Sequence, residues 1–309
     1  MHSLFCLATL LTTAIAIATA TATAIAQTAD RIAFQTFRDG NWEIYLMDTT
    51  GGAPINLTNA PSWEMRPAFS PDGRRIAFES NRSGQFELYA LDIASGTLRQ
   101  LTDAPGNGHA AFAPDGRRIA FESDRDGSWE IFLMDADGQN PLRLTDSGGA
   151  GQPTWSPDGR RIAFASNRDG NMEIYAIDAD GQNLQRLTEN ADRDWFPAWS
   201  PVGDRILFES DRDGDWDIYS IDTNGGGLTN LTNDDEWNVR PTWSADGRKI
   251  LFESTRDGTR DIFIMDADGH NAANLTQSAS WDTHPVWAPI PATTSVGFAS
   301  WAGIKRAPR

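Results

Sequence analysis

Short apolar runs alternate with Gly-, Pro- and Asp-rich corners along most of the chain, and one apolar run recurs at a nearly constant interval. It reads Arg-Ile-Ala-Phe in the first four copies and Arg-Ile-Leu-Phe or Lys-Ile-Leu-Phe in the last two. Its Phe stands at positions 34, 78, 121, 164, 208 and 252, so successive copies are 43 or 44 residues apart. Repeats of this length that contain several short strands are typical of β-propellers.

Each repeat predicts four strands joined by tight turns. A first strand ending in Trp, as at residues 153–155, precedes a Ser-Pro-Asp-Gly turn and the Arg-Ile-Ala-Phe strand. An Arg-Asp-Gly turn then leads to a third apolar strand, and an Asp-Ala-Asp-Gly turn leads to a short fourth strand ending in Leu-Thr. Gly supplies the positive φ that such hairpin turns need. Because no helical periodicity of any length occurs, we expect an all-β fold with four-stranded antiparallel blades.

The two ends of the repeat array predict a closed ring. The first copy begins at residue 31 without its first strand, whereas residues 284–287 after the sixth copy supply a first strand that has no partner. Pairing these segments gives six blades closed by strands from both termini, which leaves only short, protected edges. We therefore expect a six-bladed propeller over residues 31–291 and a C-terminal tail over 292–309. The segment 295–300 resembles a further second strand but has no place in this count.

Charge and composition narrow the class of partner. The net charge is −17, with 43 acidic against 26 basic residues, which argues against nucleic acid and against anionic lipid. Residues 1–26 contain no Asp, Glu, Lys or Arg and end in Ala-Ile-Ala, as expected for a cleaved signal peptide, although the basic start is missing and an uncleaved membrane anchor is the alternative. The single cysteine, Cys6, lies in this segment, so the mature chain has no disulfide.

The repeated acidic turns are candidates for structure or for calcium. A residue that every blade repeats serves a need that every blade shares, so we interpret the Asp residues as turn residues that accept bonds from backbone amides. The calcium alternative fits poorly, because the loop from Asp178 to Glu189 has Gly at its fourth position, whereas an EF-hand loop has Gly at the sixth.

A second recurrent group comprises strand carboxylates, which we expect to pair with the Arg of each Arg-Asp-Gly turn. These carboxylates are Glu79, Glu122, Glu209 and Glu253.

The combination of Ser-Pro-Asp-Gly-Arg-Arg-Ile-Ala-Phe, Asn-Arg-Asp-Gly and Met-Asp-Ala-Asp-Gly resembles the repeat of TolB-type six-bladed propellers, over residue 31 to about residue 289. The resemblance implies a periplasmic protein of the Tol-Pal envelope system, whose channel mouth receives the peptidoglycan-associated lipoprotein. TolB proteins place an α/β domain and a TolA-binding segment before the propeller. Since the first strand here begins at residue 31, we expect neither that domain nor coupling to TolA.

The links between blades differ from copy to copy and therefore carry the binding-site prediction. Four links contain Trp, which with Arg is enriched at binding hot spots, and the links at 105–109 and 148–152 are rich in Gly. We expect an aromatic crescent with a gap around one channel mouth; the alternative is that each Trp only covers the end of its blade. The candidate binding residues are Trp63, Glu64, Arg66, His109, Asp194, Trp195, Trp237, Arg240, Trp281, Asp282 and His284.

Three classes of function remain. Neither a Gly-x-Ser-x-Gly elbow nor a His-Glu-x-x-His motif occurs, so we expect no catalysis, no cofactor and no metal. The prediction is an exported periplasmic monomer that binds an envelope protein such as the peptidoglycan-associated lipoprotein, with secretion or membrane anchoring as alternative locations. A glycan ligand is one alternative, because exposed Trp faces also suit sugar rings. A metal-dependent hydrolase or lyase is another, with His109 and His284 meeting Asp194 or Glu236 across the channel.

Overall fold

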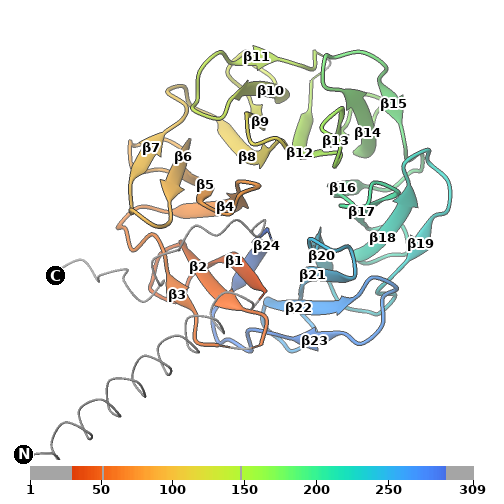
Figure 1. The fold of residues 1–309 in the computed structure, drawn as a ribbon. Coiled ribbons are helices and arrows are strands. Elements are labelled where there is room, and N and C mark those ends of the chain that lie inside the picture. The colour runs from red at the N-terminus through yellow and green to blue at the C-terminus, as the bar shows by residue number, and fades with distance from the viewer. Residues whose placement is uncertain (1–29, 51, 147, 290–309) are drawn as a thin grey trace, which may run out of the picture.

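Six four-stranded antiparallel sheets form a closed ring in a computed structural model of the protein, which describes residues 30–50, 52–146 and 148–289 (Figure 1). Every regular element in these ranges is a strand, so the predicted fold class is confirmed. Within the same ranges no helix is long and apolar enough to cross a membrane. The predicted signal peptide at 1–26 and the predicted tail at 292–309, with the strand-like segment 295–300, lie outside the described residues.

The strands of each blade follow one another outward from the centre of the ring (Figure 1). The inner strands are β24 (Asp282–Trp287), β4 (Glu64–Phe69), β8 (Asn107–Phe112), β12 (Ala150–Trp155), β16 (Asp194–Trp199) and β20 (Asn238–Trp243). The second strands are β1 (Arg31–Thr36), β5 (Arg75–Ser80), β9 (Arg118–Ser123), β13 (Arg161–Ser166), β17 (Arg205–Ser210) and β21 (Lys249–Ser254). The third strands are β2 (Glu43–Asp48), β6 (Glu87–Asp92), β10 (Glu130–Asp135), β14 (Glu173–Asp178), β18 (Asp217–Asp222) and β22 (Asp261–Asp266). The outer strands are β3 (Ile55–Asn56), β7 (Leu98–Gln100), β11 (Leu142–Arg143), β15 (Gln185–Arg186), β19 (Thr229–Asn230) and β23 (Ala273–Asn274).

The ring closes between the first and last strands, as the sequence predicts. Strand β24 pairs with β1, with Ile32 opposite Trp287 and Ala33 opposite Val286. The first blade also packs on the sixth, because Ile32 and Phe34 share an apolar cluster with Leu251. One blade is thus built from both ends of the described chain, which leaves no inner strand unpaired.

The second strands carry the core because each sheet lies between two neighbouring sheets. The Phe of every second strand is fully buried, and so is the Ile two positions before it. Apolar clusters join neighbouring blades: in one of them Ile131 of β10 packs with Ile162 and Phe164 of β13. Burial on both faces explains why these strands are continuous apolar runs.

The repeated acidic residues hold the turns. In the Ser-Pro-Asp-Gly turn of the fourth blade, Ser156 Oγ donates a hydrogen bond to Asp158 Oδ1 at 2.7 Å, and the amide of Arg160 donates to the same oxygen at 3.0 Å. Asp169 of the following Arg-Asp-Gly turn accepts a bond from the hydroxyl of Tyr175 at 2.5 Å. The interpretation of these Asp residues as turn residues is therefore confirmed.

The Arg of each Arg-Asp-Gly or Arg-Ser-Gly turn lies over two aromatic rings of its own blade. In every blade except the fourth it also binds the first residue of the inner strand. Arg82 lies 4.9 Å from the ring centre of Tyr89 and pairs with Glu64 at 2.8 Å. Arg212 and Arg38 pair in the same way with Asp194 and Asp282. The expected pairing of this Arg with the second-strand carboxylates is wrong, because the first residue of the inner strand lies closer to the turn.

Candidate binding site at the propeller channel

The inner strands are longer than the sequence suggested, and this moves several candidate residues from loops into the channel wall. The strand predicted at 153–155 begins at Ala150, and the equivalent extension occurs in the other blades. A β-bulge makes it possible: Met65 lies opposite Glu79 and Ala68 opposite Ala77, so Arg66 and Pro67 together face Phe78. Proline is tolerated at a bulge of an edge strand, where no ladder hydrogen bond is lost.

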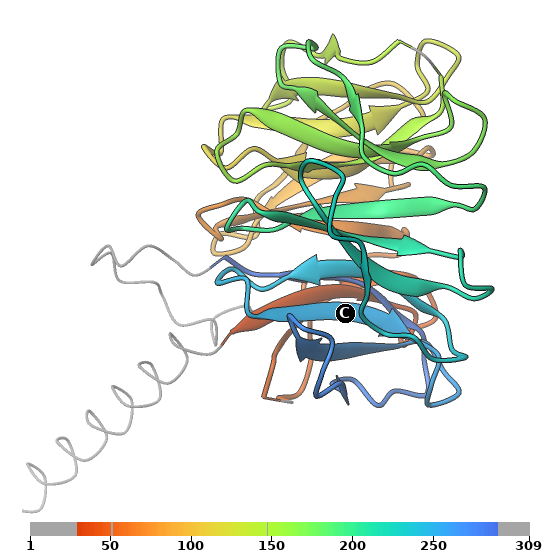
Figure 2. The ribbon, with the colours of Figure 1, turned by 90° about the vertical axis from the view of Figure 1, so that its right-hand side faces the viewer.

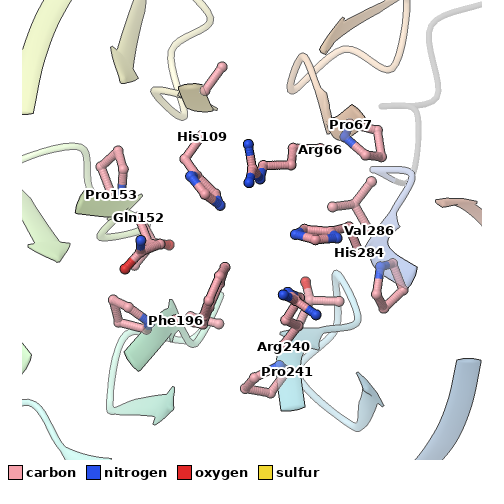
Figure 3. A pocket seen from close by; sticks show the side chains of 16 residues that line it. Arg66, Pro67, His109, Gln152, Pro153, Phe196, Arg240, Pro241, His284 and Val286 are labelled. Carbon is pink, nitrogen blue, oxygen red and sulfur yellow. The ribbon is translucent and has the colours of Figure 1, made fainter. Parts of the chain in front are cut away.

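One bulge residue from each inner strand projects into the central channel (Figure 3). We call this set the channel ring: Arg66, His109, Gln152, Phe196, Arg240 and His284. All six have positive φ, between 43° and 53°, although none is glycine. A side chain in this left-handed region costs about 1–2 kcal/mol relative to ordinary backbone. The channel ring and the residues after it surround a cavity of about 180 Å³.

The second-strand carboxylates bind the backbone amides of channel-ring residues. The backbone amide of His109 donates to Glu79 Oε1 of the preceding blade at 2.9 Å, and the amide of His284 donates to Glu253 Oε1 at 2.7 Å. In the first blade Gln35 takes the same role for Arg66, at 2.8 Å. Each of these side chains therefore joins one blade to the next at the bulge.

The same carboxylates bind channel-ring side chains of their own blade. Arg240 Nη1 donates to Glu253 Oε2 at 2.8 Å, Arg66 pairs with Glu79, and His109 Nδ1 lies 2.6 Å from Glu122 Oε1. Burial raises the pKa of Glu122, but the charge and hydrogen bond of His109 outweigh it and hold that pKa below its ordinary value.

Two further groups at the channel have displaced pKa values. Burial raises the pKa of Glu209 to about 7, with partial compensation from the charge of Arg240. The pKa of His284 lies well below its ordinary value, first because the ring is buried and then because Arg240 and Arg66 are positively charged. His284 is therefore neutral at physiological pH.

The polar atoms that face the cavity have no hydrogen-bond partner within the described part of the chain. They include Nε of Arg66 and Arg240, Nε2 of His109 and His284, and Oε1 of Gln152. Figure 3 shows these side chains converging on a common open space, with Phe196 forming an apolar wall. Arg240 also lies over the ring of Phe196, 5.0 Å from its centre. The two Arg side chains offer donors to a ligand, and Gln152 Oε1 offers an acceptor.

The structure places the eleven predicted site residues in three different environments. Arg66, His109, Arg240 and His284 meet at the channel ring. Glu64, Asp194 and Asp282 are completely buried and bind the turn Arg residues, so they stabilise blades and do not reach the cavity. Three Trp residues immediately precede inner strands, and Trp195 lies within one.

Three of the four predicted Trp residues form the expected crescent, which we call the Trp arc: Trp63, Trp237 and Trp281. Their side chains are 45%, 49% and 56% exposed. Each immediately precedes an inner strand, and these strands, β20, β24 and β4, are neighbours in the ring (Figure 1). The guanidinium of Arg260 bridges two of them, 5.8 Å from the ring centre of Trp237 and 5.9 Å from that of Trp281.

Trp195 does not join the Trp arc. It is the second residue of β16 and lies opposite Glu209, whereas the position equivalent to Trp63 is occupied by Arg193. Arg193 lies over Trp216 at 4.9 Å from its ring centre. The prediction of four adjacent Trp residues on the links is therefore wrong for Trp195, which lies two residues beyond the position equivalent to Trp63.

Sequence reasoning missed Gln152, Phe196 and Arg260. The first two occupy the position before the Pro of the inner strand, as Arg66 and His284 do, so aligning the copies on that Pro, which is Ala110 in one of the six, would have found the channel ring. Arg260 stands where other blades have Trp42 or Trp129, and only the three-dimensional contact with two Trp rings reveals it.

The metal alternative finds no complete ligand set among the described residues, where no group of three or more His, Cys, Asp or Glu side chains is placed to hold an ion. The two His rings do approach each other, with centres 6.3 Å apart. Asp194, which we considered as a third ligand, is bound to Arg212 instead.

The chain matches the TolB beta propeller domain over residues 19–152 and 146–289. It belongs to this family. No curated protein matches the chain. Among solved structures, TolB from Acinetobacter baumannii is 26% identical with a TM-score of 0.76, and the similarity covers 84% of this chain and 67% of that one.

Two further solved structures place the fold in context. A putative TolB from Agrobacterium tumefaciens is 24% identical over 82% of this chain and 89% of that chain, with a TM-score of 0.67. An oligogalacturonate lyase in complex with manganese is 16% identical over 80% of this chain and 73% of that chain, with a TM-score of 0.59. At these identities the likeness concerns the propeller fold, which supports several functions.

Proposed function

We propose that this TolB-like propeller is an exported, non-catalytic protein of the bacterial periplasm that binds a protein partner at the channel mouth bordered by the Trp arc. The observation that carries the proposal is the exposure of Trp63, Trp237 and Trp281 on three neighbouring links around one mouth. Large aromatic side chains that are half exposed together are typical of interaction surfaces. The uncharged segment 1–26 with its Ala-Ile-Ala end supports export.

The partner that we propose is an envelope protein such as the peptidoglycan-associated lipoprotein, by resemblance to TolB. Arg260 between two Trp rings adds a cation to the aromatic surface, a combination that favours protein recognition. The buried, ion-paired state of Glu64, Asp194 and Asp282 assigns these residues to the scaffold rather than to the contact surface. Among the predicted polar residues, this leaves Arg66, His109, Arg240 and His284, which line the channel and not the outer face.

A calorimetric titration with the soluble domain of the peptidoglycan-associated lipoprotein from the same organism tests the proposal. We expect the combined substitution Trp63→Ala, Trp237→Ala and Trp281→Ala to weaken binding at least about a hundredfold, because clustered Trp anchors dominate interface energy. Trp129→Ala is the matched control: this Trp is 42% exposed on the turn of a blade outside the Trp arc. Absence of binding by the unmodified chain, or equal binding by the triple variant, would contradict the proposal.

The glycan alternative makes a different prediction for the same variants. Exposed Trp rings also stack on sugars, so peptidoglycan fragments are the second ligand to titrate. Binding of these fragments that disappears in the triple variant, with no binding of the lipoprotein, would favour a glycan-binding propeller. We give preference to the protein because family membership points to it.

A further inference from the structure

The channel ring presents a cluster of buried polar atoms without partners, two of them Arg donors, that the protein partner on the outer face does not explain. Arg66 on β4 and Arg240 on β20 stand on either side of His284 on β24, and His109 on β8 completes this side of the cavity (Figure 3). Nε of both Arg side chains and Nε2 of both His side chains are buried and lack a partner within the described ranges. Buried donors without partners are costly, which indicates that something binds them.

The neighbouring carboxylates are already occupied. Glu79 accepts from the amide of His109 and from Arg66; Glu253 accepts from the amide of His284 and from Arg240. Glu122 binds His109 through one oxygen, and the other accepts from the amide of Gln152 at 3.0 Å. Both oxygens of each of these carboxylates are thus engaged in holding the scaffold, and a ligand in the cavity meets the donors.

The electrostatics around His284 are consistent with this arrangement. After burial, the causes of its lowered pKa include the guanidinium groups of Arg240, Arg66 and Arg260. Glu253 Oε1 also lies 3.8 Å from His284 Nδ1. Several Arg side chains thus act on this ring in a chain whose net charge is −17.

Backbone geometry adds an independent argument. Every position of the channel ring has a left-handed conformation that glycine would adopt at least cost, yet all six carry a side chain. The backbone is the same in all blades, whereas the side chains differ. Strain that is kept at one concave site is a feature of ligand-binding positions.

We propose that the channel ring binds a carboxylate group, with Arg66 and Arg240 as its charged partners and His109 and His284 beside them at the cavity. Carboxylates accept bonds from guanidinium groups in geometries that combine charge and direction. The cavity of about 180 Å³ is equivalent to roughly six waters and accommodates an acetate ion or an aspartate side chain. Phe196 supplies an apolar wall for the carbon atoms of the ligand. This site stands apart from the proposed protein partner and can be tested without it.

The histidine ring signals of the full chain in NMR provide the test, because His270 is a built-in reference. Its side chain is 77% exposed and lies on an Asp-Ala-Asp-Gly turn, on the opposite face from the links. At constant ionic strength, acetate should shift the signals of His109 and His284 in a saturable manner and leave His270 unchanged. Acetamide, which has the same shape without charge, should produce no saturable shift.

Two pairs of probes distinguish the origin of the carboxylate. Acetate represents a free small acid, and N-acetyl-aspartyl amide represents an acidic side chain in a peptide, with N-acetyl-asparaginyl amide as its neutral counterpart. Tighter binding of the aspartyl compound than of acetate would assign the site to a chain-borne carboxylate. Tighter binding of acetate would assign it to a free acid.

Variants of the two Arg residues sharpen the result. Arg66→Gln and Arg240→Gln should each weaken acetate binding about tenfold, the loss expected for one charge-assisted hydrogen-bond partner. Arg66→Lys should retain most of the affinity, and Arg160→Gln, on a turn of the opposite face, should change nothing. If a Gln variant fails to fold, the acetate titration of the unmodified chain still tests the proposal.

The proposal is overturned if acetate leaves His109 and His284 unshifted up to concentrations at which His270 begins to respond. An equal response to acetamide would also overturn it, because charge would then play no part. A response of both His rings to Mn²⁺ but not to acetate would overturn it in favour of a metal site.

Discussion

Two parts of the ring differ at equivalent positions while sharing one scaffold. In the Trp half, the links before β20, β24 and β4 place Trp237, Trp281 and Trp63 on the surface. In the Gly half, the links before β8 and β12 have Gly106 and Gly149 at the same position, both with positive φ. A Cβ on Gly149 would lie 1.9 Å from Asn167 Oδ1, so this backbone does not admit a Trp. The gap beside the Trp arc therefore results from the backbone conformation of these links as well as from their lack of aromatic residues.

The two halves also differ beneath the surface. In the Trp half, Glu64 and Asp282 are buried carboxylates that bind Arg82 and Arg38. In the Gly half, Ala150 takes the equivalent position, and Nη2 of Arg168 has no partner within the described residues. The stacking of an Arg on two aromatic rings therefore occurs in every blade, whereas the ion pair of that Arg with the inner strand occurs only in some blades.

The largest expected effect follows from this second difference. Arg82→Ala should lower the free energy of unfolding by about 3–5 kcal/mol, because Glu64 is left as an unpaired buried charge. Arg168→Ala is the matched change, since Arg168 has the same stacking on Tyr175, at 5.0 Å, but no carboxylate to leave behind. It should cost about 1 kcal/mol. Urea unfolding of both variants measures the difference, and equal costs would refute the assignment of the ion pair.

The next effect concerns Glu209, whose pKa is raised to about 7. Because the folded state holds this proton more tightly than the unfolded state, stability falls as pH rises from the ordinary pKa of 4.5 to about 7. Glu209→Gln should remove this loss of stability. The first blade already has an amide at the equivalent position, where Gln35 Oε1 accepts a hydrogen bond from the backbone amide of Arg66 at 2.8 Å.

Denaturant unfolding of Glu209→Gln and of the unmodified chain at two pH values checks the sign. The increase in the free energy of unfolding that Glu209→Gln causes should be near zero at about pH 4 and reach about 3 kcal/mol above about pH 8. A variant that is less stable than the unmodified chain at the higher pH would show that ionised Glu209 is needed at the blade junction.

A smaller effect on stability distinguishes a backbone position in the Gly half from a surface side chain in the Trp half. Gly149→Ala should destabilise the fold by about 1–2 kcal/mol, because alanine must adopt a left-handed conformation and displace Asn167. Trp63→Ala should change stability by less than about 0.5 kcal/mol, since its side chain is 45% exposed. Thermal unfolding of both variants compares them. A large loss of stability in Trp63→Ala would support the alternative that the Trp covers the end of its blade.

The smallest effect tests the junction within the Trp arc. Arg260→Ala should weaken partner binding severalfold, because it removes the cation that lies between the rings of Trp237 and Trp281. Titration with the lipoprotein domain measures this, and Arg193→Ala, which removes an Arg lying over a Trp outside the arc, is the control. Equal effects of the two substitutions would show that the position of Arg260 has no special role.

Much of the architecture could be predicted because the information is local and repeated. The Ile and Phe of residues 161–164 recur in every copy since each second strand is buried on both faces, and Gly at turns such as 156–159 recurs since each hairpin needs the same φ. The partners of Glu79 could not be predicted, because it binds the amide of His109 in the next blade, 30 residues further along the chain. The register of Trp195 was open to prediction, because it stands two residues before Pro197, whereas Trp63 stands four residues before Pro67.

The sequence by itself determined the number of blades and the closure of the ring, because a repeated unit that buries both faces of its sheet needs a neighbour on each side. It also determined which residues make turns. Only the tertiary structure decided that Arg66, His109, Arg240 and His284 face one cavity while Glu64 and Asp282 are withdrawn from it. The reason is physical: a bulge sets the direction of each inner side chain, and residues from different blades become neighbours only when the ring has closed.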